Sequence, residues 1–332
     1  MAGFKIFSKF HGELQLQAGL PKKFNKIIPG AECGYVAHNE MYMAFQRVKV
    51  GPYGLVFSHY NGMSNSDRYS CEDDEPVIEI NFNIDGKARI DLTSHDWVVF
   101  QPEYHEIMIL PYVKDQVHFL TNNLENFGIH IPYSKFKLLA NKFKHLRPLL
   151  KAYENQKFGF LNKKIPIKTS IKSMALLIQL TQRIERGLYD EITLELLEQL
   201  IEQSLVQDIE NKPSKKIKFT YVDIEGVINF HSRLQSDLSV PVSIKDLIEK
   251  SHMIPGKLRK GFKLVYDITP YEYRQQCVYE YIYEQMKDSN YTTLSELVDM
   301  SNTQNVTEFA KQFKRYIGVD PKNLLKKELI LT

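Results

Sequence analysis

The side chains that could support catalysis are few and poorly spaced along this chain of 332 residues. Cys33, Cys71 and Cys277 lie far apart and do not form the paired spacing that binds zinc. His95 and His105 stand ten residues apart, and no His-x-His pair occurs. The chain also has no phosphate-binding loop, dinucleotide fingerprint or serine nucleophile elbow. We therefore expect a protein that is not an enzyme, with no catalytic residue, no metal ligand and no cofactor.

Basic side chains gather instead on two short segments with helical periodicity, Pro255–Tyr266 and Val306–Ile317. Each predicted helix has an apolar face, and lysine and arginine lie opposite it. Such a basic face can neutralise phosphates and reach base edges, although solvated lysine faces are common on surface helices. The pattern occurs twice, which favours nucleic acid as the partner. The candidate DNA-binding residues are Lys257, Arg259, Lys260, Lys263, Thr307, Lys311, Lys314 and Arg315.

Capping signals around these segments predict short helices with sharp ends. A small polar residue precedes a carboxylate by three positions at Ser243, Thr269, Thr293 and Asn305, and Asp320-Pro321 marks a further helix start. Two pairs, each a short helix followed by a longer one, then match the helix-turn-helix layout. The predicted helices are Asp223–Ser236, Ser243–Lys250, Pro255–Tyr266, Pro270–Lys287, Leu294–Ser301, Val306–Ile317 and Pro321–Leu329.

Two motifs in this region resemble the DNA-binding domain of the AraC/XylS family. The run Lys257–Lys263 followed by Ile268–Tyr273 is similar to its first half, and Phe309–Pro321 is similar to its second, signature half. The resemblance implies an all-α double helix-turn-helix domain at 221–332 that binds double-stranded DNA as a sequence-specific transcription regulator. RNA polymerase and a small effector are further partners that the family implies.

A finer resemblance points to one subgroup of that family. Gly261-Phe262 and the stretch Ile184–Leu197 are similar to the pyochelin-responsive regulator and its relatives. Several positions depart from the family's pattern, although Asn and Asp tolerate the left-handed backbone that a turn needs and Met300 can replace a lost apolar anchor. These departures are Asn302-Thr303 for Gly-Phe, Asp267 for Gly, Val278 for Arg and Ile254 for a small polar cap.

The first 130 or so residues read as short strands rich in Val, Ile, Phe and Tyr, which predicts a small barrel or sandwich. Asp85-Gly86 is the strongest hairpin signal. We therefore expect an α+β multidomain chain with a β sensor domain at 1–132. The predicted strands are Met41–Val50, Tyr53–Ser58, Val77–Ile84, Ala88–Leu92, Trp97–Gln101, His105–Leu110, Gln116–Leu120 and Asn126–Ile131.

In the AraC/XylS family a cupin-like β-barrel often binds a small effector, and Thr93–His105 resembles its hairpin. Trp97, Phe100, Tyr104 and His105 are the candidate effector-binding residues, and the alternative is that they fill the barrel core. A metal-dependent cupin enzyme is a further alternative, disfavoured by the spacing of His95 and His105.

The middle of the chain, at 133–211, predicts a helical segment for packing or dimerisation. Its helices are Tyr133–Phe143, Ile171–Arg186 and Ile192–Ile209, with Gly187 as a stop. An apolar stripe of Leu194, Leu197, Ile201 and Leu205 fits ordinary packing or, as the alternative, a homodimer seam through Ile192–Ile209. The polar, lysine-rich stretch at 212–220 predicts a linker.

Composition limits the class of protein and the cellular compartment that we expect. The chain carries 43 Lys+Arg against 40 Asp+Glu, a net charge of +3, which excludes a histone-like polycation. The odd cysteine count, the lack of a signal peptide and the lack of a long apolar window predict a cytoplasmic protein with no membrane span. The second function that fits is a degenerate regulator that acts mainly through a protein partner.

Overall fold

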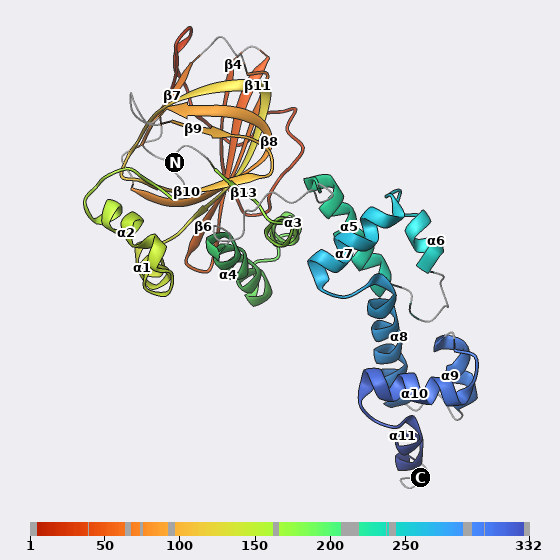
Figure 1. Cartoon of the computed structure of the whole chain (residues 1–332). Helices are drawn as coiled ribbons and strands as arrows, with labels where there is room; N and C mark the ends of the chain where they lie inside the picture. The colour runs from red at the N-terminus through yellow and green to blue at the C-terminus, as the bar shows by residue number, and fades with distance from the viewer. Residues whose placement is uncertain are drawn as a thin grey trace. The chain divides into compact units, whose positions relative to one another are not determined.

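The computed structural model divides the chain into two compact units, Met1–Ser214 and Lys215–Thr332 (Figure 1). Several predicted features, namely His95, the caps Ser243 and Thr293, Asn302 and most of the linker, lie outside the residues that the structure describes. The described residues are 5–38, 40–63, 68–73, 76–91, 97–161, 166–206, 219–236, 238, 244–287, 294–301 and 303–328.

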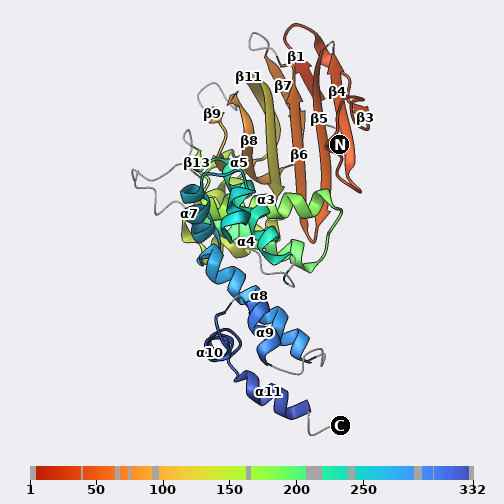
Figure 2. The same ribbon diagram turned by 90° about the vertical axis from the view of Figure 1, so that its right-hand side faces the viewer.

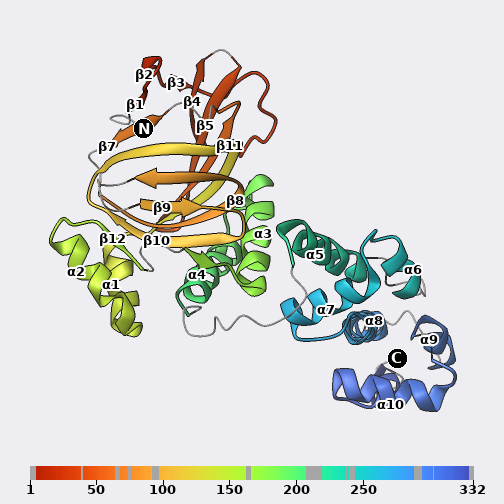
Figure 3. The same ribbon diagram turned by 45° about the horizontal axis from the view of Figure 1, so that its top comes forward.

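The first unit is built on one curled antiparallel sheet (Figure 3). Among the described residues the main path through the sheet runs β12-β10-β8-β11-β6-β5-β4-β3, with the other strands attached beside it. The strands are β1 (Lys5–Ser8), β2 (Gly12–Leu14), β3 (Gln17–Ala18), β4 (Glu32–His38), β5 (Met41–Val50), β6 (Tyr53–Asn61), β7 (Tyr69–Asp73), β8 (Val77–Asp91), β9 (Trp97–Phe100), β10 (Tyr104–Leu110), β11 (Val113–His130), β12 (Gly159–Phe160) and β13 (Ile167–Lys168).

The prediction of a hairpin at Asp85-Gly86 is wrong, because β8 runs through these residues without turning back. Gly86 has φ +74°, and a Cβ there would collide with the carbonyl oxygen of Asn123 on β11. The register between β8 and β11 shifts at this point, which is the mark of a β-bulge. The glycine therefore serves a bend within a long strand rather than a turn between two strands.

The long pairing between β8 and β11 also shows that two predicted strands are one. Gln116–Leu120 and Asn126–Ile131 are parts of the single strand β11, which crosses the bulge opposite β8. β9 and β10 do not form a ladder with each other in the described residues, since each pairs with a different part of β8. The short strands β1 to β4, β7, β12 and β13 were not predicted, and most of them are too short to show an alternating pattern.

One face of the sheet carries an aromatic row that crosses four strands. Phe57, Phe127, Phe82 and His105 stand directly opposite one another on β6, β11, β8 and β10. Successive ring centroids are 4.8, 6.4 and 5.0 Å apart, and all four side chains are buried. The row makes this side of the sheet an apolar surface for the helices to cover.

Helix α4 (Glu191–Val206) covers part of that face. Nδ1 of His105 lies 3.0 Å from the hydroxyl of Thr169, and its Nε2 lies 3.4 Å from the carbonyl oxygen of Ser204 on α4. The hydroxyl of Tyr53 donates to Glu198 on the same helix. The other helices of this unit are α1 (Tyr133–Lys142), α2 (Arg147–Glu154) and α3 (Ile171–Glu185).

The apolar stripe of α4 faces inward. Leu197, Ile201 and Leu205 are at most 1% exposed within a single copy of the unit, and α3 packs beside them. This supports the packing interpretation of the stripe, because side chains covered in this way are not available to a second copy. The break between α3 and α4 falls at Gly187, whose φ is +73° and whose N–H bonds the carbonyl of Ile184.

The second unit is helical in its described residues. The predicted box at Thr269 forms, since its hydroxyl accepts from the N–H of Glu272 and the Glu272 carboxylate accepts from the N–H of Thr269. A capping box at Thr220 and Asp223, which was not predicted, starts the first helix two residues before its predicted start. The helices are α5 (Tyr221–Gln235), α6 (Ile244–Glu249), α7 (Pro255–Tyr266), α8 (Pro270–Lys287), α9 (Leu294–Ser301), α10 (Val306–Ile317) and α11 (Pro321–Glu328).

The buried position of His105 predicts a pH-dependent stability. Burial lowers the pKa of His105 to about 4, against a smaller opposing effect of its bond to Ser204. The unfolded chain takes up the proton near pH 6.5 while the fold does not, so stability is complete above pH 6.5 and declines as the pH falls towards 4. Between pH 7 and pH 5 we expect the free energy of unfolding of the parent chain to fall by about 2 kcal/mol more than that of a His105→Gln variant.

Urea unfolding of both proteins at the two pH values measures this difference. Equal losses in the two proteins would show that His105 does not titrate as the buried geometry requires.

Candidate nucleic-acid interface

The first of the two predicted helix pairs corresponds to α6 and α7, which pack on α5. Leu258 and Phe262 of α7 are fully buried against Val227 and Phe230 of α5. The ring of His231 stacks on Tyr266 and Tyr273 at centroid distances of 4.1 and 4.5 Å. Since these residues come from α5, α7 and α8, the stack fixes α7 relative to the start of α8.

The second predicted helix pair corresponds to α9 and α10, which share a core with a later part of α8. Phe309 and Phe313 of α10 are fully buried with Tyr279 and Ile282 of α8. Tyr279 stacks on Tyr316 at 5.2 Å. One helix, α8, therefore contributes to both cores (Figures 2 and 3).

The two longer helices of these pairs repeat each other at several positions. Both end in a left-handed residue, Asp267 with φ +59° and Gly318 with φ +85°. A proline, Pro270 or Pro321, then begins the next helix. The same separation along the chain relates Leu258 to Phe309, Phe262 to Phe313, Lys260 to Lys311 and Lys263 to Lys314.

The structure places most of the predicted contact residues on the outer faces of α7 and α10. At about 100° per residue, the lysines lie on the side of each helix away from its buried pair. α7 contains no acidic residue, and the one carboxylate on α10, Glu308, accepts a hydrogen bond from Gln312. Lys260 is half-buried; the exposed members are Arg259, Lys263, Thr307, Lys311, Lys314 and Arg315.

Lys257 lies apart from the others. Its Nζ is 2.7 Å from the carboxylate of Asp223 on α5 and lies over the ring of Phe219 at 5.8 Å. Asp223 belongs to the capping box of α5, and Lys257 helps to hold the pKa of this carboxyl below its usual value against the opposing effect of burial. The structure thus gives Lys257 a partner inside the unit rather than a place on the outer face.

Both basic faces come within electrostatic reach of one carboxylate at the start of α8. The pKa of Glu272 is lowered, first by its hydrogen bonds with Thr269 and then by the charges of Lys263 and Arg315. Lys263 belongs to α7 and Arg315 to α10.

A buried arginine joins the supporting helices. Arg274 of α8 is 4% exposed, and its Nη1 donates to the carbonyl oxygens of Leu234 and Ser236 at 2.8 and 2.9 Å. These carbonyls stand at the end of α5, where no further helical N–H can reach them. A guanidinium at a helix C-terminus also suits the helix dipole.

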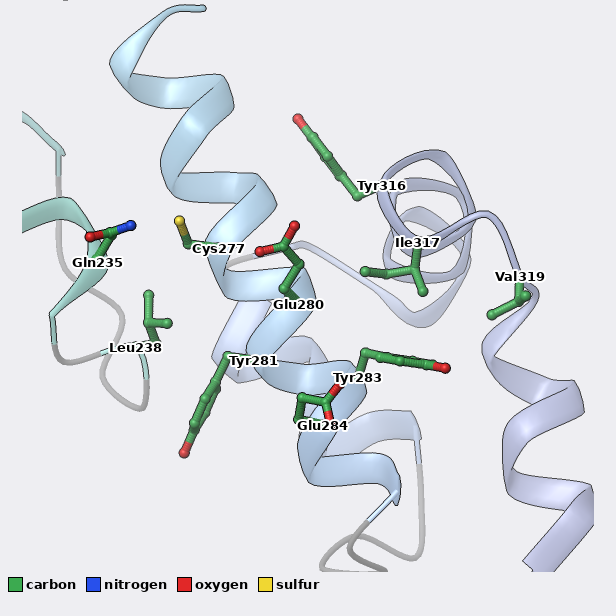
Figure 4. Close-up of a pocket in the computed structure, with 10 residues that line it drawn as sticks. All are labelled: Gln235, Leu238, Cys277, Glu280, Tyr281, Tyr283, Glu284, Tyr316, Ile317 and Val319. Atoms are coloured by element: carbon green, nitrogen blue, oxygen red, sulfur yellow. The ribbon is translucent and has the colours of Figure 1, made fainter. Parts of the chain in front are cut away.

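Another surface of the same unit has the opposite charge. A groove of about 720 Å³ runs beside α8, and Figure 4 shows Glu280 between Cys277 on one side and Tyr316 and Ile317 on the other. Two carboxylates and three tyrosines line this groove, and none of the described residues that line it is lysine or arginine. Glu284 is paired with Lys287 at 3.0 Å, and the described lining of the groove offers no basic side chain to a phosphate.

The departures from the family pattern have local explanations. Asp267 takes the left-handed conformation expected of it, and Ile254 begins α7 without a side-chain cap. Val278 is buried in the second core, where Met300 also packs. A Cβ at Gly261 would meet Phe219 and Val227 at 2.8 Å, so close packing of α7 accounts for that glycine without reference to a subgroup.

The candidate effector residues of the first unit are not brought together. Tyr104 and His105 are neighbours on β10 and therefore point to opposite faces of the sheet. Phe100 is buried in a cluster with Met108 and Leu110, whereas the ring of Trp97 lies under Arg89 at 5.0 Å. No group of three or more metal-ligating side chains occurs in the described part of the chain.

The different surroundings of Lys257 and Lys263 predict different effects of the same substitution. Lys257→Met removes the ion pair with Asp223 and should lower the free energy of unfolding by about 1 kcal/mol or less, with DNA affinity nearly unchanged. Lys263→Met should leave stability unchanged and weaken DNA binding. Urea unfolding and DNA titration of both variants test this, and a loss of DNA affinity from Lys257→Met equal to that from Lys263→Met would contradict it.

No helix in the described residues is long and apolar enough to cross a membrane. Neither a protein-family model nor a curated protein matches the chain. Among solved structures it is similar to the AraC-like transcriptional activator CuxR, with 10% identity, a TM-score of 0.36 and coverage of 80% of this chain and 86% of that one.

The chain is also similar to ToxT from Vibrio cholerae O395 bound to (E)-4-(8-methylnaphthalen-1-yl)but-3-enoic acid. Identity is 14%, the TM-score is 0.29, and the match covers 82% of this chain and 98% of ToxT. The 7S globulin of Momordica charantia gives 10% identity and a TM-score of 0.19 over 39% of this chain and 34% of that one. Likeness at these levels carries no function over to this chain.

Proposed function

We propose that this protein is a sequence-specific regulator of transcription that binds double-stranded DNA through α7 and α10. One observation carries the proposal: two helices with matched basic outer faces are attached to the same helix, α8. A single basic helix is common on protein surfaces, but a matched pair on a shared support has the geometry of a two-part reader.

The length of α8 suits this role. Its 18 residues span about 27 Å, somewhat less than the ~34 Å of one turn of B-DNA. Two helices attached to successive parts of α8 would then be placed to enter successive major-groove segments on one side of the duplex. The arginines and lysines of the two faces would contribute mainly through phosphates, and a minority of the contact residues would reach base edges.

The curled-sheet unit would then control the DNA-binding unit. We propose control by a small effector, in a cytoplasmic protein whose further partner is RNA polymerase. A siderophore-like effector would follow only from the subgroup resemblance, and the packing of Gly261 removes part of its support.

A second function is favoured by the groove beside α8. Its exposed glutamates and half-buried tyrosines offer a contact surface for another protein. A degenerate regulator that has lost sequence reading would use such a surface, and its DNA binding would be absent or indifferent to sequence. The same DNA titrations distinguish the two functions.

Salt dependence tests the proposal on the purified full chain. Genomic fragments that bind the protein are first selected, and the best fragment is titrated at several salt concentrations. If Lys260 and Lys311 each neutralise one phosphate, Lys260→Ala and Lys311→Ala should each make the negative slope of log K against log salt shallower by about 0.9. Lys137→Ala, an exposed lysine on α1, should leave the slope unchanged.

An affinity loss confined to the selected fragment, with the slope unchanged, would assign that lysine to base reading. Failure to enrich any fragment, in a protein whose helical unit is folded, would contradict sequence-specific regulation and favour the function through a protein partner.

A further inference from the structure

The face of the sheet opposite the aromatic row is polar where three central strands meet. Asn83 stands directly across from Asn126 of β11 and Tyr104 of β10, and Asn81 stands across from Glu106. Side chains alternate along a strand, so these residues point away from Phe82, Phe127 and the helices. Asn83 is 3% exposed and Asn126 is 8% exposed, which makes this a buried polar surface rather than a solvated one.

This face is the inside of the curl. Ser58 of β6 stands directly across from Asn126 of β11 on one side and from Phe45 of β5 on the other. Phe45 packs with Tyr60 and Phe119 in an apolar cluster. That cluster also takes in side chains from β1, β4 and β7, so strands from both sides of the curl meet there. The polar residues therefore lie next to a low-dielectric interior, where hydrogen bonds are strong.

Three amide oxygens on this inner face have no donor among the described residues. They are Oδ1 of Asn81, of Asn83 and of Asn126. Buried polar atoms of this kind nearly always have a partner, so three of them on one surface call for an explanation. A bound molecule that supplies the donors explains all three together.

The orientation of two of these amides is fixed by their other hydrogen bonds. Nδ2 of Asn81 donates to the carboxylate of Glu79 at 2.9 Å, and Nδ2 of Asn83 donates to the carbonyl oxygen of Gly86 at 3.0 Å. Both partners accept only, so turning either amide over would place oxygen against oxygen. The free atoms of Asn81 and Asn83 are therefore acceptors.

A carboxylate lies beside them. Oε1 of Glu79 leans across Gly128, where even a Cβ would collide with it. Gly128 stands directly opposite Asn81, and both Glu79 and Asn81 are half-buried. The glycine leaves the space into which the carboxylate extends.

We infer that the inner face of the curled sheet binds a small organic cation, an amine or a guanidine, through Glu79, Asn81, Asn83 and Asn126. Ammonium and guanidinium groups carry several N–H donors and no acceptor, which matches a set of free amide oxygens next to a carboxylate. A neutral polyol fits less well, because each hydroxyl brings an acceptor as well as a donor. The inference rests on the proposed function in one respect: this cation would be the effector.

Direct binding to the full chain tests the site. Methylamine, putrescine, spermidine and agmatine are titrated by calorimetry, with sorbitol as the polyol probe. We expect at least one amine or guanidine to bind with one-to-one stoichiometry and to raise the unfolding temperature, and sorbitol not to bind. Asn126→Leu and Asn83→Leu should each weaken this binding at least tenfold.

Variants that separate binding from folding complete the test. Asn126→Leu removes an oxygen with no partner among the described residues, so the ligand-free protein should remain as stable as the parent, or become more stable. Gly128→Ala should displace the Glu79 carboxylate and weaken binding. Asn155→Leu, at an exposed asparagine at the end of α2, is the matched control and should leave cation binding unchanged.

Three results would overturn the inference: no probe binds to folded protein, sorbitol binds as tightly as the amines, or Asn126→Leu binds the cation as the parent does. DNA titration of the same ligand-free protein gives an independent readout. Intact sequence-specific DNA binding without cation binding would refute this site and leave the proposed function standing. Cation binding without any DNA binding would support this site and refute the proposed function.

Discussion

The sharing of α8 between two hydrophobic cores is the constraint on which the helical unit depends. Tyr273 near its start packs with α5 and α7, whereas Tyr279 and Ile282 pack with α10. Neither helix-turn-helix can move along α8 without opening its own core, since buried aromatic rings have no alternative place to pack. The spacing of the two basic faces is therefore set by a rigid helix rather than by a loop.

The first unit depends on an equally simple constraint, the alternation of side chains along β8. Phe82 faces the helices, and Asn81 and Asn83 face the interior of the curl. The bulge at Gly86 bends this strand, so that the sheet closes around a polar surface instead of exposing it. A one-residue shift of register would exchange the two faces, which makes the register of β8 decisive for both the packing and the proposed ligand site.

Much of the helical unit could be predicted from sequence because its signals are local. The box at Thr269, the proline at Pro321 and the apolar pairs of α7 and α10 act within one or two helical turns. Features that depend on distant partners were missed: the pairing of Lys257 with Asp223 and the bulge at Gly86 opposite Asn123. The alternation in Val77–Ile84 was read as a strand, but only the curl shows that its polar side is enclosed.

The central claim is that α7 and α10 read one side of a DNA duplex together, and hydroxyl-radical footprinting of the full chain on a selected fragment tests it most directly. The account predicts two protected segments on the same side of the duplex, about one helical turn apart, and loss of one segment at a time when the basic face of α7 or of α10 is neutralised. A single protected segment, or simultaneous loss of both after either change, would contradict it.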